Sequence, residues 1–172
     1  SELVAAFIPI IPVTKSSYQD YLDIEYNMIF KKTDEILDVF YPILEISPGT
    51  HISGELNSMN NHIIVNMIAD SIKYDEALFS FIKLNASTAG QTLSISNEMK
   101  EIELSDTLKF LNFNLLGSTD KTRSSFTISA NARDSATTNV ELNAQATYLP
   151  SGQTSFKLLP SRIKLEGDEW II

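Results

Sequence analysis

The most regular feature of the sequence is the alternation of apolar and polar side chains, which runs from Leu22 almost to the C-terminus. Successive side chains of a β-strand point to opposite faces, so a period of two predicts strands with one apolar and one polar face. The predicted strands cover residues 22–30, 51–57, 62–69, 71–74, 77–87, 92–96, 108–116, 124–131, 138–148, 155–159 and 162–165. Turn residues such as Ser47–Thr50 and Ala89–Gly90 separate them, and this spacing is typical of an all-β fold.

One stretch has a helical pattern instead. Thr33 is a good N-cap, and the two acids that follow it suit the positive first turn of a helix. Leu37 and Phe40 share one helical face, and Pro42 prevents continuation. We predict a short helix over residues 34–41.

The most apolar stretch is Leu3–Val13, which contains Pro9 and Pro12. Its eleven residues are too few to span a bilayer, which takes about 20. It also lacks the basic flank and small-residue cleavage site of a signal peptide. An edge strand or extended crossover is expected there.

These patterns predict a mainly β fold with one short helix near the end of the first third of the chain. An apolar face can line an open groove or pack against a second sheet, and periodicity does not distinguish the two. We expect an elongated, half-open antiparallel or spiral β-groove, with a β-sandwich as the alternative. The 172 residues form one β-rich segment, with extended chain and the helix in 1–46 and β-rungs in 47–172.

Alternation also predicts which apolar residues point inward. The predicted inward-facing residues are Ile63, Val65, Met67, Ile82, Leu84, Leu93, Ile95, Leu111, Phe113, Phe126, Ile128, Leu142, Phe156, Leu158, Ile163 and Leu165.

Composition narrows the range of partners. The formal net charge is −9 and the 13 Lys and Arg residues are scattered, which argues against nucleic acid and against an anionic membrane surface. There is no cysteine, so disulfides, thiol catalysis and cysteine-based metal sites are excluded.

No constellation of catalytic residues stands out. His51 and His62 lack a third metal ligand at a convincing spacing, and a rim or surface position is expected for both. No serine lies in a nucleophile elbow, and no phosphate-binding or calcium-binding motif is present. Acid pairs such as Glu101/Glu103 fit the outer face of a strand, and the Asn85-Ala-Ser87 sequon is assigned no role. We expect no enzyme activity, no metal and no cofactor.

Three stretches resemble TamB-type translocation and assembly module proteins of the Bacteroidetes, which belong to the AsmA-like group. The first is FYPILEISPGTHISGELNSMNNHIIVNMIADSIKYD (Phe40–Asp75), in which a short helix precedes an SPGT strand and an SIKY strand. The second is LNFNLLGSTDKTRSSFTISANARDSATTNVELNAQATY (Leu111–Tyr148), and the third is PSRIKLEGDEWII (Pro160–Ile172).

The resemblance implies a specific role. Proteins of this family are long, anchored in the inner membrane by one N-terminal helix, and reach across the periplasm as a half-open β-structure with an apolar lining. They are linked to phospholipid transport to the outer membrane and to outer-membrane protein assembly with a TamA/BamA-type barrel. This chain would be an internal periplasmic segment that contacts lipid acyl chains, whereas the barrel would bind other parts of the full-length protein.

The last residues fit such a segment. Glu166-Gly-Asp168 predicts a tight turn, and Glu169–Ile172 begins a returning strand that carries the only Trp. An exposed apolar edge of this kind is expected to pair with a second copy in a crystal or at high concentration. Two alternatives to the lipid groove stay open: a binding module that pairs strand edges during outer-membrane protein assembly, and an extracellular structural β-domain.

Overall fold

The computed structural model of the chain describes residues 21–33, 37, 39–105, 108–132, 139–149, 151–165 and 168–172. The stretch Leu3–Val13, for which an edge strand or crossover is predicted, lies outside these residues, as does most of the predicted turn before β11.

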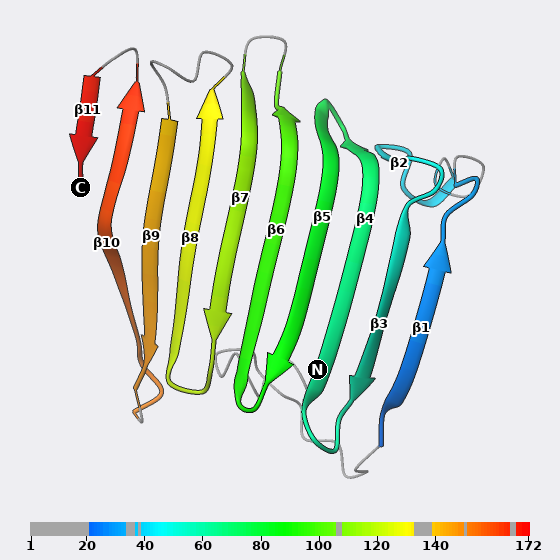
Figure 1. Cartoon of the computed structure of the whole chain (residues 1–172), viewed down its shortest axis with the longest axis horizontal. Helices are drawn as coiled ribbons and strands as arrows, with labels where there is room; N and C mark the ends of the chain where they lie inside the picture. The colour runs from blue at the N-terminus through cyan, green and yellow to red at the C-terminus, as the bar shows by residue number, and fades with distance from the viewer. Residues whose placement is uncertain are drawn as a thin grey trace.

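All described strands belong to one antiparallel sheet, which Figure 1 shows face-on. The strands are β1 (Asp23–Ile29), β2 (Leu44–Ile46), β3 (His51–Asn57), β4 (His62–Tyr74), β5 (Ala77–Ala89), β6 (Thr92–Glu103), β7 (Lys109–Thr119), β8 (Arg123–Ala132), β9 (Asn139–Tyr148), β10 (Thr154–Leu165) and β11 (Asp168–Ile171). Their spatial order follows the chain from β1 through β3 to β11, and β2 pairs with β4. β1 and β11 are the two edges.

The prediction of a mainly β, open antiparallel sheet is confirmed, and the strands described here form one sheet rather than the two of a sandwich. The main differences concern strand length. β4 joins the predicted strands 62–69 and 71–74, and β10 joins 155–159 and 162–165. β6 continues past Ser96 to Glu103, because its polar second half pairs with β5 and β7 on both sides of an interruption at Lys100.

The predicted helix is present as a short helical segment. Leu37, Val39 and Phe40 have helical backbone, and the Leu37 N–H donates to the Thr33 carbonyl at 2.8 Å. The Tyr41 N–H donates to the Leu37 carbonyl at 2.6 Å. Phe40 is exposed, so the expected apolar helix face is not buried at this residue.

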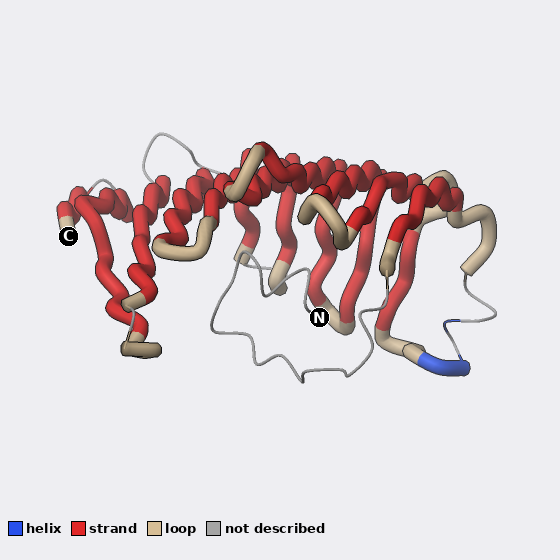
Figure 2. The backbone as a smooth tube through the Cα atoms, turned by 90° about the horizontal axis from the view of Figure 1, so that it is seen from below, coloured by secondary structure: helices blue, strands red, loops and turns tan. Residues whose placement is uncertain are grey.

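The sheet is not flat. In Figure 2 the ends of β4 to β7 bend away from the rest of the sheet, all toward the same side. The pairing of these strands is interrupted at Asp70, Phe81, Lys100 and Asn112. Phe81 and Asn112 have positive φ angles of 53° and 51°, a conformation that non-glycine residues seldom adopt. A residue of this kind interrupts the regular pleat, which is how a continuous strand can turn.

A second bend lies in β9 and β10, whose hairpin tip turns toward the same side of the sheet (Figure 2). The register of β10 against β9 shifts between Leu159 and Arg162, as at a β-bulge. The side chains of Asn143 and Ser161 fill the irregularity: the Asn143 N–H donates to Ser161 Oγ at 2.9 Å, and Asn143 Nδ2 donates to the Pro160 carbonyl at 3.0 Å.

The predicted turn Ser47–Thr50 forms the corner between β2 and β3, both of which pair with β4. Gly49 has a φ of 86°, which glycine adopts at no steric cost. Ser47 exchanges hydrogen bonds with Ser71 of β4, each 3.0 Å long, and Thr50 Oγ1 donates to the Ser47 carbonyl at 2.8 Å. The corner is therefore fixed by its own side chains.

Gly54 in the middle of β3 permits a close approach of three strands. A Cβ built on it would overlap the carbonyl oxygen of Ile64 in β4 and lie 2.6 Å from the Tyr26 hydroxyl of β1. The Tyr26 ring therefore covers Gly54, an arrangement in which an aromatic side chain replaces the packing that glycine lacks.

We predict that Gly54→Ala lowers the free energy of unfolding by about 3 kcal/mol, because the obstacle is backbone that cannot move aside. Urea denaturation measures the loss. Gly117→Ala is the matched control: its Cβ would lie 3.2 Å from the Phe126 ring, a side chain that can shift. The control should lose about 1 kcal/mol or less. Equal losses at both glycines would contradict this account of β3.

Candidate apolar binding face

Cross-strand partners in an antiparallel sheet point to the same face, so the register assigns side chains to faces. One face carries four aligned rows. The first row holds Leu56, Ile63, Thr88, Leu93, Thr119, Ser124, Ala146 and Phe156. The second row holds Tyr26, Gly54, Val65, Ala86, Ile95, Gly117, Phe126, Ala144 and Leu158.

The third and fourth rows run closer to the bend. The third holds Met28, Ile52, Met67, Leu84, Asn97, Leu115, Ile128 and Leu142. The fourth holds Ala69, Ile82, Met99, Phe113, Ala130, Val140, Ile163 and Trp170. We call the surface made by these four rows the concave face.

Burial at the bend shows that this face is the inner one. Ala69 and Ile82 are 2% and 3% exposed, whereas their chain neighbours Ile68 and Phe81, on the opposite face, are 57% and 59% exposed. Substantial contacts between described strands occur only between hydrogen-bonded neighbours, so both faces belong to a single layer. Side chains on the inside of a bend shield one another, and those on the outside are spread apart.

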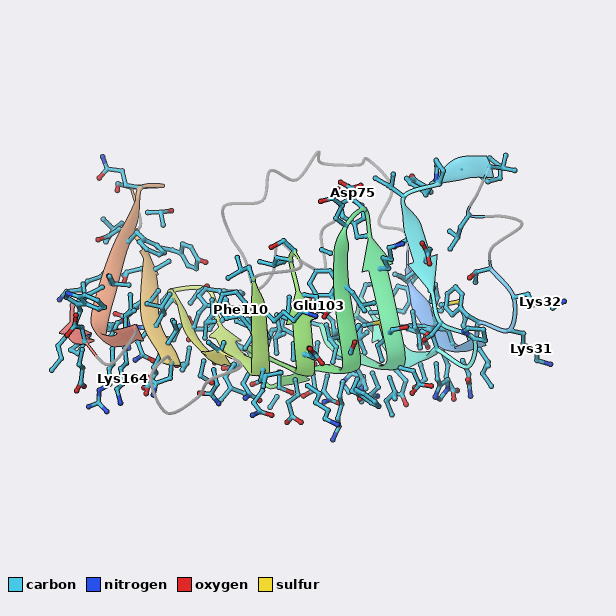
Figure 3. The ribbon with its side chains drawn as sticks, turned by 90° about the horizontal axis from the view of Figure 1, so that it is seen from above. Lys31, Lys32, Asp75, Glu103, Phe110 and Lys164 are labelled. Carbon is cyan, nitrogen blue, oxygen red and sulfur yellow. The ribbon has the colours of Figure 1, made fainter. Side chains whose placement is uncertain are left out.

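The opposite, convex face is mostly polar, although Ile68, Phe81 and Leu116 are also exposed on it. Its residues over β3 to β9 include Ser53, Glu55, Asn66, Lys83, Asn85, Ser94, Ser96, Glu98, Asn114, Ser125, Thr127, Asn143 and Gln145. Figure 3 shows nitrogen and oxygen atoms at the tips of many side chains along this outer side. At the bend Lys100 Nζ lies 4.8 Å from the centre of the Phe81 ring, a distance at which a cation and a ring attract each other.

The structure brings the predicted inward-facing residues together on the concave face, with two exceptions. Leu111 lies in β7 opposite Glu101 and Asn131, in a row that also holds Ser71 and Ser80. The irregular residue Asn112 separates it from Phe113. Leu165 pairs with Asp168, and its side chain lies outside the described part of the chain.

Several residues of the face were not predicted. Met99 and Asn97 lie in the half of β6 that sequence patterns did not identify as a strand. The signal was present, since Leu93, Ile95 and Met99 keep a period of two, but the amide at Asn97 interrupts it. Leu56 and Ile52 of β3 were not predicted as inward-facing either.

Beyond the bend the apolar positions change phase. Ile46, Ile72, Phe79, Ile102, Phe110 and Ala132 form one row there. In each of the strands β4 to β7, the member of this row lies three positions along the chain from the fourth-row residue of the same strand. In a regular strand, residues an odd number of positions apart point to opposite faces, so the alternation is broken between the two rows. Figure 3 shows these bent ends, with Phe110 and Glu103 labelled and Asp75 at the tip of the β4–β5 turn.

The other face of the bent ends carries ion pairs. Lys73 donates to Glu45 at 2.7 Å, and Lys109 pairs with Glu103. The hydrogen bond to Glu45, together with the charge of that carboxylate, raises the pKa of Lys73 above its ordinary value. Both members of the Lys73–Glu45 pair are open to solvent, so the pair adds little stability.

Hydroxyl groups at the hairpin end of the concave face are bonded to one another. Thr119 Oγ1 lies 2.5 Å from Ser124 Oγ, which lies 2.5 Å from the Tyr148 hydroxyl. Thr88 Oγ1 accepts a hydrogen bond from the Ile63 N–H at 2.9 Å. These groups are engaged in holding β4, β5, β7, β8 and β9 together.

The two histidines lie on the convex side. His51 Nε2 lies 2.7 Å from Asn27 Oδ1, and His62 Nε2 lies 3.4 Å from Glu55. Within the described residues no group of three or more His, Asp or Glu side chains is placed to hold a metal ion.

Asp120 organises the turn between β7 and β8. Its Oδ1 accepts hydrogen bonds from the Thr122 N–H and hydroxyl, each at 2.7 Å, and from the Arg123 N–H at 3.0 Å. These bonds, chiefly those from Thr122, stabilise the carboxylate and lower the pKa of Asp120 below its ordinary value.

Comparison with protein-family models, with curated proteins and with solved structures finds no match to the chain. The resemblance to TamB-type proteins therefore stays a prediction from the residues quoted above. No helix in the described part of the chain has the length and apolar character needed to cross a membrane.

The Asp120 turn gives a pH-dependent prediction. Because the fold lowers the pKa of Asp120, the hydrogen bonds to its carboxylate stabilise the fold fully above the ordinary aspartate pKa, near 4. This stabilisation is lost as the pH falls through the pKa that Asp120 has in the folded chain. We expect Asp120→Ala to lower the free energy of unfolding by about 1 kcal/mol at pH 7, and by less at pH 2.5. Urea titrations of both proteins at the two pH values measure this. Lys121→Ala, in the same turn, should show no such change. A loss at Asp120 that is independent of pH would contradict the assignment.

Proposed function

We propose that the concave face binds the hydrocarbon chains of lipids. The observation that carries the proposal is the arrangement of the face: four aligned, mostly apolar rows on the inside of a bent, single-layer sheet, with no described strand packed across them. Such a face leaves apolar area that a bound chain would remove from water.

The energetics fit a chain-shaped ligand. Burial of hydrocarbon contributes about 0.8 kcal/mol per CH₂ and depends little on direction. The residues in the middle of the face, such as Leu84, Leu115 and Ile128, are only partly buried by the sheet itself. A lipid chain lying across β5 to β8 would complete their burial.

The resemblance to TamB-type proteins gives this binding a cellular setting. Under the proposal the chain is a periplasmic segment of an inner-membrane-anchored protein that carries phospholipid toward the outer membrane and supports outer-membrane biogenesis. Its polar convex face would lie in water. The protein would act without catalysis, because a passive surface needs only apolar contact.

Two adjacent leucines of β7 provide the test. Leu115 lies on the concave face opposite Asn97 and Ile128, whereas Leu116 lies on the convex face opposite Ser96 and Thr127 and is 56% exposed. A benzoylphenylalanine is placed at either position. The purified chain is then irradiated with vesicles of phosphatidylethanolamine and phosphatidylglycerol, and adducts are detected by mass spectrometry.

We expect phospholipid adducts at position 115 and few at position 116, since only the first position faces the proposed ligand. Greater exposure of Leu116 would favour the opposite result if contacts with the vesicles were random. Adducts at position 116 equal to or above those at 115, or none at 115, would refute the proposal.

A second function, strand-edge pairing with a partner, is favoured by one specific observation. β11 covers β10 only from Ser161 to Leu165, and the Thr154–Leu159 half of β10 has no described neighbour on its outer side. Phe156 and Ile171 at this edge are 71% and 74% exposed. An open edge with apolar side chains accepts another strand readily.

If the edge binds strands, the chain should self-associate through it at high concentration. We predict that the weight-average mass from sedimentation rises with concentration for the wild type and stays monomeric for Phe156→Lys/Ile171→Lys, since edge lysines oppose pairing. Leu116→Lys, on the convex face away from the edge, should behave like the wild type. A wild-type chain that stays monomeric at millimolar concentration would argue against edge pairing.

A further inference from the structure

One polar side chain lies in the centre of the concave face. Asn97 of β6 stands opposite Leu84 of β5 and Leu115 of β7, and its same-face neighbours along β6 are Ile95 and Met99. All four neighbours are apolar. The nearest charges along β6, on Glu98 and Lys100, belong to the convex face.

Asn97 Oδ1 is buried and has no hydrogen-bond partner. The Asn97 side chain as a whole is half-buried, and its oxygen differs from the fully buried polar side chains of the described residues. Thr50, Thr119, Ser124 and Ser161 all form hydrogen bonds with neighbouring side chains or backbone.

An unpaired buried acceptor destabilises a fold, because the group has lost its bonds to water without replacement. A leucine at this position would continue the third row between Leu84 and Leu115 and remove that penalty. The Asn97 oxygen thus lowers the stability of the fold and forms no hydrogen bond within it. This combination is typical of a residue that binds a ligand.

We propose that Asn97 is the polar contact of the concave face, and that its carboxamide oxygen accepts a hydrogen bond from a bound amphiphile. This inference rests on the proposed function, since the hydrocarbon part of the same ligand lies on the apolar rows. Because Oδ1 is buried in the ligand-free chain, the bound state requires rotation about the Cβ–Cγ bond of Asn97, which exchanges the amide oxygen and nitrogen.

The surroundings define the chemistry of the donor. An ionised phosphate or carboxylate would lie among Leu84, Ile95, Met99 and Leu115, with no cation among the described residues of the four rows, and burial of an unpaired charge is costly. The ligand group at Asn97 is therefore a neutral O–H or N–H on the hydrocarbon part of the lipid, away from any charged headgroup.

Competition between two matched ligands tests the inference. The fluorescent hydrocarbon 1-dodecylpyrene is bound to the purified full chain and displaced by 1-hexadecanol or by 1-methoxyhexadecane. The two have the same hydrocarbon chain, but only the alcohol can donate a hydrogen bond. The wild type should prefer the alcohol by about three- to tenfold, the ratio that one hydrogen bond supplies.

Asn97→Leu should abolish the preference and raise the melting temperature of the ligand-free chain, because the unpaired oxygen is gone. Asn97→Val provides a second apolar variant in case the leucine does not fit. Asn66→Leu is the matched control: Asn66 lies on the convex face of β4, exposed to solvent, and its replacement should leave the preference unchanged.

The outcomes separate the two proposals. If the wild type binds dodecylpyrene but shows no preference, or if Asn97→Leu keeps it, the role of Asn97 is refuted and the hydrocarbon-binding face stands. If the wild type binds no dodecylpyrene, the proposed function fails, and the role of Asn97 fails with it.

Discussion

Hydrogen bonding between neighbouring strands is the interaction on which the rest of the molecule depends. The described strands form a single layer, and their substantial contacts are with the strands beside them. Stability therefore comes from the ladder and from cross-strand side-chain pairs rather than from a core between two layers. Close approaches such as Gly54 under Tyr26 and Gly117 under Phe126 keep the ladder tight where a larger side chain would open it.

The single-layer arrangement also explains why one face of the sheet is mostly apolar and the other mostly polar. A single layer leaves both faces near water, and bending shelters only one of them. Apolar residues are concentrated on the sheltered side, and Ser, Asn, Thr and charged residues occupy the other. Irregular backbone accompanies the two bends at few residues: Phe81 and Asn112 are in left-handed conformation, and Asn143 and Ser161 are hydrogen-bonded at the register shift of β10. A surface that is apolar, concave and uncovered by any other described strand is thus a consequence of how the sheet is built.

Much of this could be predicted from sequence, because a period of two determines both strand positions and faces. The strands of residues 51–57, 124–131 and 138–148 were found within a residue or two of their ends. The bend could not be predicted. Phe81 is a residue type that favours strands, and nothing in its identity signals a positive φ. Leu111 was assigned to the apolar face for the same reason, since an unbroken alternation through Asn112 would have placed it beside Phe113. The missing hydrogen-bond partner of Asn97 Oδ1 could not be predicted from the sequence either, because it depends on which side chains lie opposite Asn97 in β5 and β7.

The central claim is that hydrocarbon lies on the concave face, and isotope-filtered NMR observes this contact directly. With methyl-labelled protein and unlabelled dodecylphosphocholine below its micellar concentration, the account predicts intermolecular NOEs from the chain methylenes to the methyl groups of Leu84, Leu115 and Ile128. The methyl groups of Ile68 and Leu116, which are more exposed but lie on the convex face, should give none. NOEs confined to Ile68 and Leu116, or spread equally over both faces, would contradict it.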